Sequence, residues 1–384
     1  MFGLWRPGLS LETSGVCKTL LAKTATDVEL AVRRHFAAAT GEGADLVVGG
    51  LPFDSAEPAL LFQPMLADLV ISTPERSAPS LTPEGRVPRA LAIGGEPDAA
   101  GYAVMVRRAL ASLAHPALQP FDKVVLARKL QVDLDGDLDA RTLAALLARD
   151  PSVTVFLLDL SQASGDAGHR LVGATPELLV SRRGLAVCSH PLAGSARRRR
   201  DPSDDRAAAE GLLASEKDRR EHGLVVESIL DQLAPLCAEL SAPGDASLCS
   251  TASMWHLGTR IDGRLKGPDM PSAAGLAALL HPTPAVGGFP RERAMEVIRE
   301  LEPAGRGFYA GAVGWCDEAG DGEWHVALRC AEMRPGRLTL HAGAGIVEGS
   351  VPEDEAAETL AKFVAILDAL GIDLRAELRE CAAL

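Results

Sequence analysis

The chain has 384 residues, 47% of them hydrophobic, which is enough to bury a large core as one domain or two. Its net charge of −13 argues against a general affinity for nucleic acid or anionic membranes. Seven scattered cysteines without a CxxC pair indicate neither a zinc ribbon nor a disulfide framework, and they fit a reducing cytoplasm. The N-terminal segment breaks at Pro7 and Gly8 before an apolar run of signal-peptide length, and no run elsewhere approaches 18 apolar residues, so we expect neither export nor membrane insertion.

The first third of the chain predicts a mixture of helices and strands. Residues 26–40 and 98–114 have the spacing of amphipathic helices, whereas the apolar runs at 44–53 and 58–64 are typical of strands. A Ser-, Pro- and Gly-rich segment between them predicts a loop. A further strand is expected to begin in "FDKVVLARKLQVDL", residues 121–134.

The remainder alternates strongly between strand and helix patterns. Three strand-like segments between 152 and 195 precede a predicted helix at 215–230. Residues 308–347 contain two turn signals between strand-like runs and predict an antiparallel meander. Ser350 and Glu353 have the spacing of a capping box at the start of a final helix.

Glu221 lies in the predicted helix at 215–230 on the same side as two aliphatic residues. Val225 and Ile229 follow it at one and two helical turns, so its carboxylate points toward the core. A buried carboxylate without a partner costs several kcal/mol. We therefore expect a positive charge to meet Glu221.

The final helix repeats this pattern. Glu355, Glu358, Lys362 and Ile366 fall in one narrow stripe, so charged side chains continue a line that becomes core. Salt-bridged helix surface is the ordinary interpretation of such a stripe. Three carboxylates from two helices, without a His or Cys cluster, are also typical of a hard-cation site, because Mg²⁺ prefers oxygen ligands. We expect Mg²⁺ to supply the charge that Glu221 needs.

Glu177 and Lys123 are charged residues in apolar strand-like runs. Apolar surroundings raise the pKa of a carboxyl such as Glu177, which suits a proton donor; a Glu on the wet face of a strand is the alternative. A lysine removed from water, such as Lys123, loses basicity and can act as a base; an edge-strand lysine that prevents aggregation is the alternative. Spacing alone does not decide between these interpretations.

Two glycine-containing segments predict a site for an anion. Gly194 and Ser195 in "PLAGS" and Gly343 in "HAGAG" place backbone N–H groups where a carboxylate can approach, and Arg329 can pair with it. His256 in "MWHLGT" is a candidate to orient a ligand, although a core histidine is the ordinary alternative. Neither segment is a P-loop or a complete dinucleotide motif, so nucleotide binding is disfavoured.

Nine sequence blocks between about residues 120 and 370 resemble, in order, those of the chorismate-utilising enzymes. They are "FDKVVLARKL", "GATPELL", "PLAGS", "SEKDRREH", "LLHPTPAVGGFP", "RGFYAGAVGW", "GDGEWHVALR", "HAGAGIV" and "PEDEAAETLAKF". Within the family, "LLHPTPAVGGFP" is similar to the isochorismate synthase branch, especially the siderophore-associated synthases. Lys123 supports this branch, because anthranilate synthases typically carry glutamine there.

The resemblance implies an α+β fold of the aminodeoxychorismate synthase type, with two large antiparallel sheets packed face to face and helices outside. It also implies a single chorismate-binding domain over residues 1–384. In this prediction, residues 1–115 are a variable N-terminal part that adds strands to the same sheets, and residues 120–370 form the catalytic region.

By resemblance, the activity is the Mg²⁺-dependent, reversible isomerisation of chorismate to isochorismate. Lys123 matches the base that activates water, and Glu177 matches the acid that protonates the leaving hydroxyl. Glu221 and Glu358 match metal ligands, with Glu355 nearby. The residues that match substrate contacts are Gly194, Ser195, His256, Arg329, Gly343 and Lys362.

Two alternatives remain open at this point. A salicylate synthase would form isochorismate and then eliminate pyruvate, and a non-catalytic chorismate-binding protein would keep the pocket without turnover. The resemblance further implies a monomeric cytoplasmic enzyme that has chorismate as its small-molecule partner, requires no glutaminase subunit and supplies siderophore biosynthesis. The sequence does not distinguish this pathway from menaquinone formation.

Overall fold

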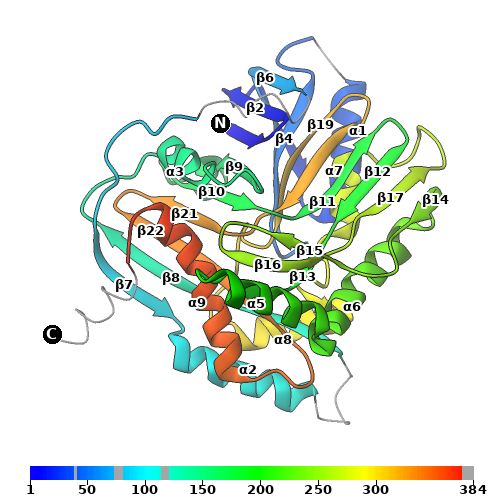
Figure 1. Cartoon of the computed structure of the whole chain (residues 1–384). Helices are drawn as coiled ribbons and strands as arrows, with labels where there is room; N and C mark the ends of the chain where they lie inside the picture. The colour runs from blue at the N-terminus through cyan, green and yellow to red at the C-terminus, as the bar shows by residue number, and fades with distance from the viewer. Residues whose placement is uncertain (39–40, 73–80, 114–120, 374–384) are drawn as a thin grey trace.

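The computed structural model describes residues 1–38, 41–72, 81–113 and 121–373, and every strand pairing in that part of the chain is antiparallel. Two large sheets and one small sheet, with helices around them, make up the fold (Figure 1). The predicted α+β architecture with two large antiparallel sheets is therefore confirmed. The small third sheet was not predicted.

The ten-stranded sheet combines the N-terminal strands with strands from the middle and end of the chain. Its strands, in spatial order, are β18 (Gly288–Phe289), β8 (Lys123–Leu134), β22 (Arg337–Ile346), β21 (Cys330–Arg334), β10 (Arg170–Thr175), β9 (Thr154–Asp159), β1 (Phe2–Arg6), β2 (Leu9–Ser14) and β6 (Leu66–Ile71), while β7 (Ala90–Glu96) also pairs with β8.

The nine-stranded sheet and the small sheet complete the β structure. The nine strands are, in spatial order, β14 (Cys237–Ser241), β17 (Ile261–Leu265), β12 (Ala186–His190), β11 (Leu178–Arg183), β20 (Gly322–Val326), β19 (Ala312–Asp317), β4 (Leu46–Leu51), β5 (Ala59–Gln63) and β3 (Lys18–Ala22). The small sheet contains β13 (Leu192–Arg197), β16 (Met254–Gly258) and β15 (Ser247–Ser250).

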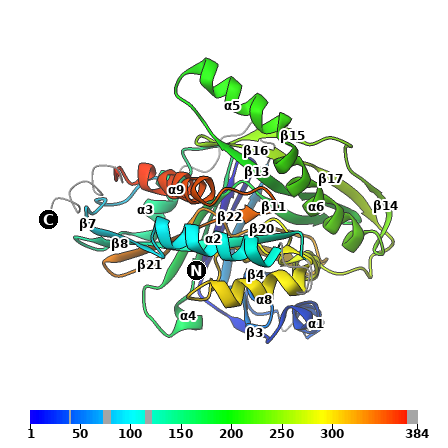
Figure 2. The same cartoon turned by 90° about the horizontal axis from the view of Figure 1, so that it is seen from below.

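The helices cover these sheets in groups. They are α1 (Ala25–Ala37), α2 (Ala99–Leu113), α3 (Ala140–Leu147), α4 (Ser161–Ser164), α5 (Pro202–Ala214), α6 (Glu216–Leu233), α7 (Ala273–Leu280), α8 (Arg291–Leu301) and α9 (Pro352–Ala369). Helices α2, α8 and α9 lie against the ten-stranded sheet, as Figure 2 shows from below, and α1 with α7 lies against the nine-stranded sheet. Helices α5 and α6 contact the small sheet. Within the described ranges, no helix is both long and apolar enough to cross a membrane.

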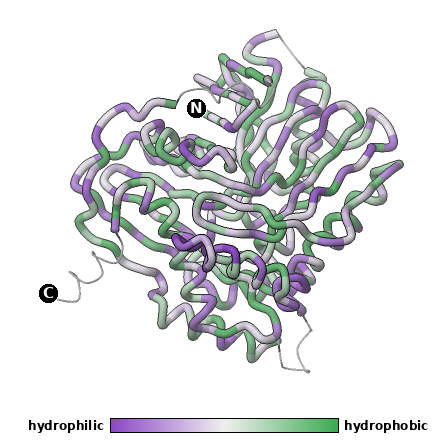
Figure 3. Tube along the Cα trace, in the orientation of Figure 1, coloured by the Kyte–Doolittle hydropathy of each residue, from purple (hydrophilic) through white to green (hydrophobic). Residues whose placement is uncertain are grey.

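The main hydrophobic core joins the two large sheets, and Figure 3 shows hydrophobic and hydrophilic stretches along both strands and helices. Leu61, Val313 and Trp324 of the nine-stranded sheet share this core with Leu126 and Leu158 of the ten-stranded sheet, all at most 1% exposed. A second core packs α3 and the end of α9 on the ten-stranded sheet. The active-site residues described below therefore extend from thoroughly buried strands.

The meander predicted over 308–347 is divided between the two large sheets. The β19–β20 hairpin belongs to the nine-stranded sheet, and the β21–β22 hairpin belongs to the ten-stranded sheet. The chain crosses between them at residues 327–329, where Arg329 has a left-handed backbone with φ of 48°. Turn signals predict hairpins correctly, but they carry no information about which sheet each hairpin joins.

The capping box predicted for the final helix is wrong. Helix α9 begins at Pro352, with Val351 as N-cap and no side-chain cap. The Ser350 hydroxyl instead accepts a hydrogen bond from the N–H of Val347 at 3.2 Å. Proline at the first helical position needs no hydrogen-bond partner for its nitrogen, which lets the helix start one residue later.

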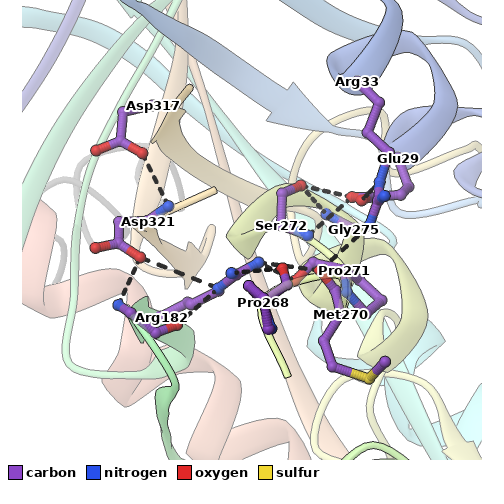
Figure 4. Close-up of polar contacts among 11 residues, drawn as sticks. Glu29, Arg33, Arg182, Pro268, Met270, Pro271, Ser272, Gly275, Asp317 and Asp321 are labelled. Atoms are coloured by element: carbon purple, nitrogen blue, oxygen red, sulfur yellow. Dashed lines mark hydrogen bonds and ion pairs between the residues drawn. The ribbon is translucent and has the colours of Figure 1, made fainter. Parts of the chain in front are cut away.

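A cluster of hydrogen bonds around buried Arg182, here called the Arg182 cluster, fixes one end of the nine-stranded sheet (Figure 4). Arg182 of β11 is 4% exposed and donates to the carbonyls of Gly184, Met270, Pro271 and Pro268 at 2.9–3.2 Å. These bonds tie the loop before α7 to the sheet. The cluster satisfies backbone groups that burial would otherwise leave unpaired.

Candidate active site

A cavity of about 90 Å³ lies where the small sheet meets β8, β22, α6 and α9. Nine of the predicted site residues line it: Glu177, Gly194, Ser195, Glu221, His256, Arg329, Gly343, Glu358 and Lys362. Lys123 and Glu355 are not in the lining and lie behind it. Folding therefore gathers residues that are up to 185 positions apart in the sequence into one pocket.

The positive charge beside Glu221 comes from Lys123. The lysine is fully buried on β8, and its Nζ lies 2.9 Å from Oε1 of Glu221 on α6. The contact lacks the angles of a hydrogen bond, and Nζ has no other hydrogen-bond partner among the described residues. Strand β8 is paired on both sides, so the alternative of an edge-strand lysine is wrong.

Gly345 allows this ion pair to form beside β22. A Cβ at Gly345 would lie 2.2 Å from Oε1 of Glu221 and 3.1 Å from Cε of Lys123. A side chain at this position would therefore displace the Glu221 carboxylate from its place beside Lys123. The structure thus gives Gly345 a steric role in the placement of the Lys123–Glu221 pair.

Glu177 occupies the crossing from β10 to β11 and is 2% exposed, so the alternative of a Glu on a wet strand face is wrong. Burial raises the pKa of Glu177 to about 8, against the opposing effects of a backbone hydrogen bond from Leu192 and the charges of Lys123 and Lys362. A carboxyl with this pKa is largely protonated at neutral pH. It can donate a proton to a group in the cavity.

The predicted stripe on α9 is divided between the cavity and the interior. Glu358 reaches the cavity, accepts a hydrogen bond from the Ser195 hydroxyl at 2.9 Å and pairs with Lys362 at 2.7 Å. Burial by itself would raise the pKa of Glu358, but Lys362 and Ser195 bring it below the ordinary value. Glu355 is 2% exposed and pairs with Lys217 of α6 at 2.5 Å.

The donor set around the cavity fits a hard cation. Glu221 and Glu358 offer carboxylate oxygens from two helices, and Mg²⁺ is commonly held by one or two carboxylates together with an anionic substrate and waters. Each acid also has an ammonium partner, and the described residues contain no ready-made group of three or more ligating side chains. Glu355 belongs to a layer behind Glu221 and Glu358.

Two cationic side chains, Arg329 and Lys362, also line the cavity. The guanidinium of Arg329 donates to the Thr251 hydroxyl at 2.8 Å and to Nε2 of His256 at 2.5 Å. Lys362 Nζ donates to the Gly343 carbonyl at 2.7 Å. Burial and the charges of Arg329 and Lys362 hold the pKa of His256 well below its usual range, so the ring is neutral.

Sequence reasoning missed several residues of the site. Tyr309 lines the cavity and stacks on His341 with ring centroids 4.8 Å apart. Lys217 partners Glu355, and Asp218 lies so near Gly194 that a Cβ there would be 3.0 Å away from it. Tyr309 lies in the family block "RGFYAGAVGW", and Lys217 and Asp218 lie in the family block "SEKDRREH", so the resemblance was the one signal that could have found them. Neither spacing nor polarity distinguishes these positions from ordinary surface residues.

A protonatable buried carboxyl, a buried lysine, paired acids and an arginine around one cavity define an enzyme site for a small anionic substrate. The model of the chorismate binding enzyme family matches residues 68–371. The chain therefore belongs to the chorismate binding enzymes, as its sequence blocks predict.

Three proteins similar to this chain are named as isochorismate synthases or as candidates for that activity. A Mycobacterium tuberculosis protein named as a candidate isochorismate synthase, MenF, is 45% identical over 92% of this chain and 94% of its own. Isochorismate synthase DhbC of Bacillus subtilis is 42% identical over 87% and 83%. The structure of Bacillus anthracis DhbC, described as a candidate 2,3-dihydroxybenzoate-specific isochorismate synthase, superposes with a TM-score of 0.88 at 37% identity, covering 97% of this chain and 96% of that one.

Proposed function

We propose that the protein is an isochorismate synthase that converts chorismate to isochorismate. The observation that carries the proposal is the buried pair of an acid and a base, Glu177 and Lys123, beside a cavity with anion-binding groups. The names of relatives at 42–45% identity over most of the chain support the same activity. Binding alone would not require a buried proton donor.

In the proposed reaction, water bonds to C2 of the ring while the hydroxyl at C4 departs and the double bonds shift between them. The ammonium of Lys123 first releases a proton, its amine form then takes the proton from the attacking water, and the carboxylate of Glu221, 2.9 Å from Nζ, stabilises the ammonium that is restored. Glu177 gives its proton to the departing hydroxyl, which leaves as water. Both proton transfers are reversible, so the enzyme should also form chorismate from isochorismate.

The remaining residues bind and orient the two carboxylates of the substrate. Arg329, Lys362 and the backbone at Gly194–Ser195 and Gly343 supply donors and positive charge in the cavity, and His256 orients Arg329. Glu221 and Glu358 would hold Mg²⁺, which when bound would screen a substrate carboxylate from these acids. Glu355 would orient this pair from behind through Lys217.

The cellular setting belongs to the same proposal. The relatives named DhbC favour supply of isochorismate to 2,3-dihydroxybenzoate, a siderophore precursor. The unpaired thiols of six described cysteines support a reducing, cytoplasmic compartment. We propose that the enzyme acts as a monomer without a glutaminase subunit, and light scattering of the purified protein tests this.

Turnover of chorismate in water enriched in oxygen-18 tests the proposed reaction. The purified protein is incubated with chorismate and Mg²⁺, and the products are separated by chromatography and weighed by mass spectrometry. Isochorismate should gain one heavy oxygen, because its C2 hydroxyl comes from water. A product without the label would contradict the proposed addition of water.

Pyruvate release distinguishes the alternative activities. A coupled lactate dehydrogenase assay should detect no pyruvate, because an isochorismate synthase retains the enolpyruvyl group. Salicylate with one equivalent of pyruvate would identify a salicylate synthase instead. Binding of chorismate without any product would identify a non-catalytic binding protein.

A further inference from the structure

Arg329 is held in an unusual way for a half-buried arginine. Its left-handed backbone, with φ of 48°, turns the side chain from the crossing between the two large sheets toward the small sheet. Its two hydrogen-bond acceptors, the Thr251 hydroxyl and Nε2 of His256, are both neutral. Non-glycine residues in this backbone region cost free energy, which indicates that the placement of Arg329 is enforced by its surroundings.

Thr251 is itself fixed in the turn between β15 and β16. It is 3% exposed, and its N–H donates to the Met254 carbonyl at 2.9 Å. Its hydroxyl oxygen accepts from the N–H of Met254 at 3.2 Å and from Arg329 at 2.8 Å. The hydroxyl therefore has one position, and that position determines where the guanidinium lies.

The turn is supported from outside by Arg198. This arginine donates to the Thr251 carbonyl at 3.3 Å and to both carboxylate oxygens of Asp205 at 2.9–3.0 Å. Its guanidinium also lies 4.3 Å from the ring centre of Trp255, whose indole N–H donates to Asp205. The segment "SARRRRDP", residues 195–202, thus contributes Arg198 to a support behind the site.

The positive charge of Arg329 has no carboxylate partner within 4 Å among the described residues. Asp150 is the acid whose charge acts on it, but the Asp150 carboxylate accepts its hydrogen bonds from the N–H of Ala252 and from the N–H and hydroxyl of Ser152. Burial lowers the pKa of Arg329 to about 10, so it still carries its charge at neutral pH. A charge held by neutral acceptors beside a cavity remains available to an anionic ligand.

We propose that Thr251 is a positioning residue for substrate binding, which together with His256 holds Arg329 through neutral acceptors and so reserves its charge for a substrate carboxylate. This inference rests on the proposed function, in which the substrate is the dianion chorismate. Neutrality is as important as position, because a carboxylate at residue 251 would hold the same guanidinium and cancel its charge.

Four variants separate position from charge. Thr251→Val removes the hydroxyl at nearly constant volume, Thr251→Ser keeps it, and Thr251→Asp replaces it with a carboxylate. Ser253→Ala is the matched control, since it changes another hydroxyl of the same turn. Initial rates give kcat and KM for chorismate, calorimetry gives Kd without turnover, and thermal unfolding verifies that each variant is folded.

Thr251→Val should raise KM and Kd about tenfold while kcat stays within about threefold, because one hydrogen bond to a charged donor is lost. Thr251→Ser and Ser253→Ala should stay within about twofold of the wild type. Thr251→Asp should weaken binding at least as much as Thr251→Val.

Asp205→Asn keeps the inference testable if Thr251→Val does not fold. It weakens the outer support and leaves every residue of the cavity in place, so it should raise KM with kcat retained. Unchanged KM and Kd in Thr251→Val would overturn the positioning role, and tight chorismate binding by Thr251→Asp would overturn the role of neutrality. If the proposed function is wrong, the wild type itself forms no isochorismate. If the wild type also fails to bind chorismate, both the proposed function and the positioning role of Thr251 are overturned.

Discussion

Two arginines of this protein, buried Arg182 and half-buried Arg329, differ in how their N–H groups are used. Arg182, at one end of the nine-stranded sheet, gives four N–H groups to loop carbonyls and is enclosed by them. Arg329, at the cavity, gives two N–H groups to the neutral groups of Thr251 and His256. A guanidinium has five such donors, so Arg329 retains more of its binding capacity for a ligand.

The difference teaches how to distinguish a structural arginine from a functional one. A structural arginine satisfies backbone groups that the fold has buried, and its removal leaves them unpaired. A functional arginine is positioned with part of its charge unused. The predictions below test this distinction across the cavity and the Arg182 cluster, beginning with the largest expected effect on turnover.

Glu177→Gln should lower kcat roughly 10²–10⁴-fold, because the proton donor is lost while the shape of the side chain is kept. In the wild type, kcat should fall as pH rises through about 8, where Glu177 loses its proton. Rate measurements from pH 6 to 9 check both statements, with exposed Glu239→Gln as the control. A pH profile that is the same in the Glu177→Gln variant would contradict the role of Glu177.

The same variant should be more stable than the wild type above pH 4.5. Native Glu177 has a pKa of about 8 against 4.5 for an ordinary Glu, so between these values the native state binds more protons than the unfolded chain. The free energy of unfolding therefore falls as pH rises through this window, by about 4 kcal/mol near pH 8, and Gln removes this cost. Urea unfolding at pH 4 and pH 8 measures the difference, which should vanish at the lower pH.

Lys123→Gln should also abolish most turnover, but it should reduce stability. Removal of the ammonium leaves the Glu221 carboxylate buried without a counter-charge, which costs about 3–5 kcal/mol. Rate assays and thermal unfolding measure the two effects, with exposed Lys266→Gln as the control. A Lys123→Gln enzyme with wild-type activity would contradict its assignment as the base.

Glu355→Gln should weaken Mg²⁺ binding about 10–100-fold, because Glu355 acts from behind Glu221 and Glu358 through Lys217. Calorimetric titration with Mg²⁺ measures this affinity without substrate. Asp354→Asn, an exposed neighbour on the same helix, is the matched control. Equal Mg²⁺ affinity in both variants would remove Glu355 from the proposed metal site.

Arg182→Ala should destabilise the fold by about 3 kcal/mol and leave KM and kcat within about twofold for the folded fraction. The loop carbonyls that it contacts would lose their donors, while the cavity would be unchanged. Thermal unfolding and rate assays below the transition test this expectation. A large rise in KM would show that the Arg182 cluster and the cavity are coupled.

Much of the site was predictable from the sequence because its segments carry recognisable blocks. Glu221 was identified by a carboxylate on an apolar helix face, and Glu177 by an acid in an apolar strand. The family blocks then grouped these residues with Lys123 and Arg329. Thr251, Lys217 and Tyr309 were missed because a buried hydroxyl, a helix lysine or a tyrosine in a turn has no local signature of its role.

The sequence by itself determined the family, the antiparallel α+β architecture and the residue types of the site, because local patterns and ordered blocks are properties of the chain. Only the tertiary structure decided that Lys123, not a metal alone, provides a charge beside Glu221, that the 308–347 segment is shared between two sheets, and that neutral groups hold Arg329. These features depend on distances between segments far apart in the chain. Such distances are set by how the sheets and helices pack together, and no local pattern encodes them.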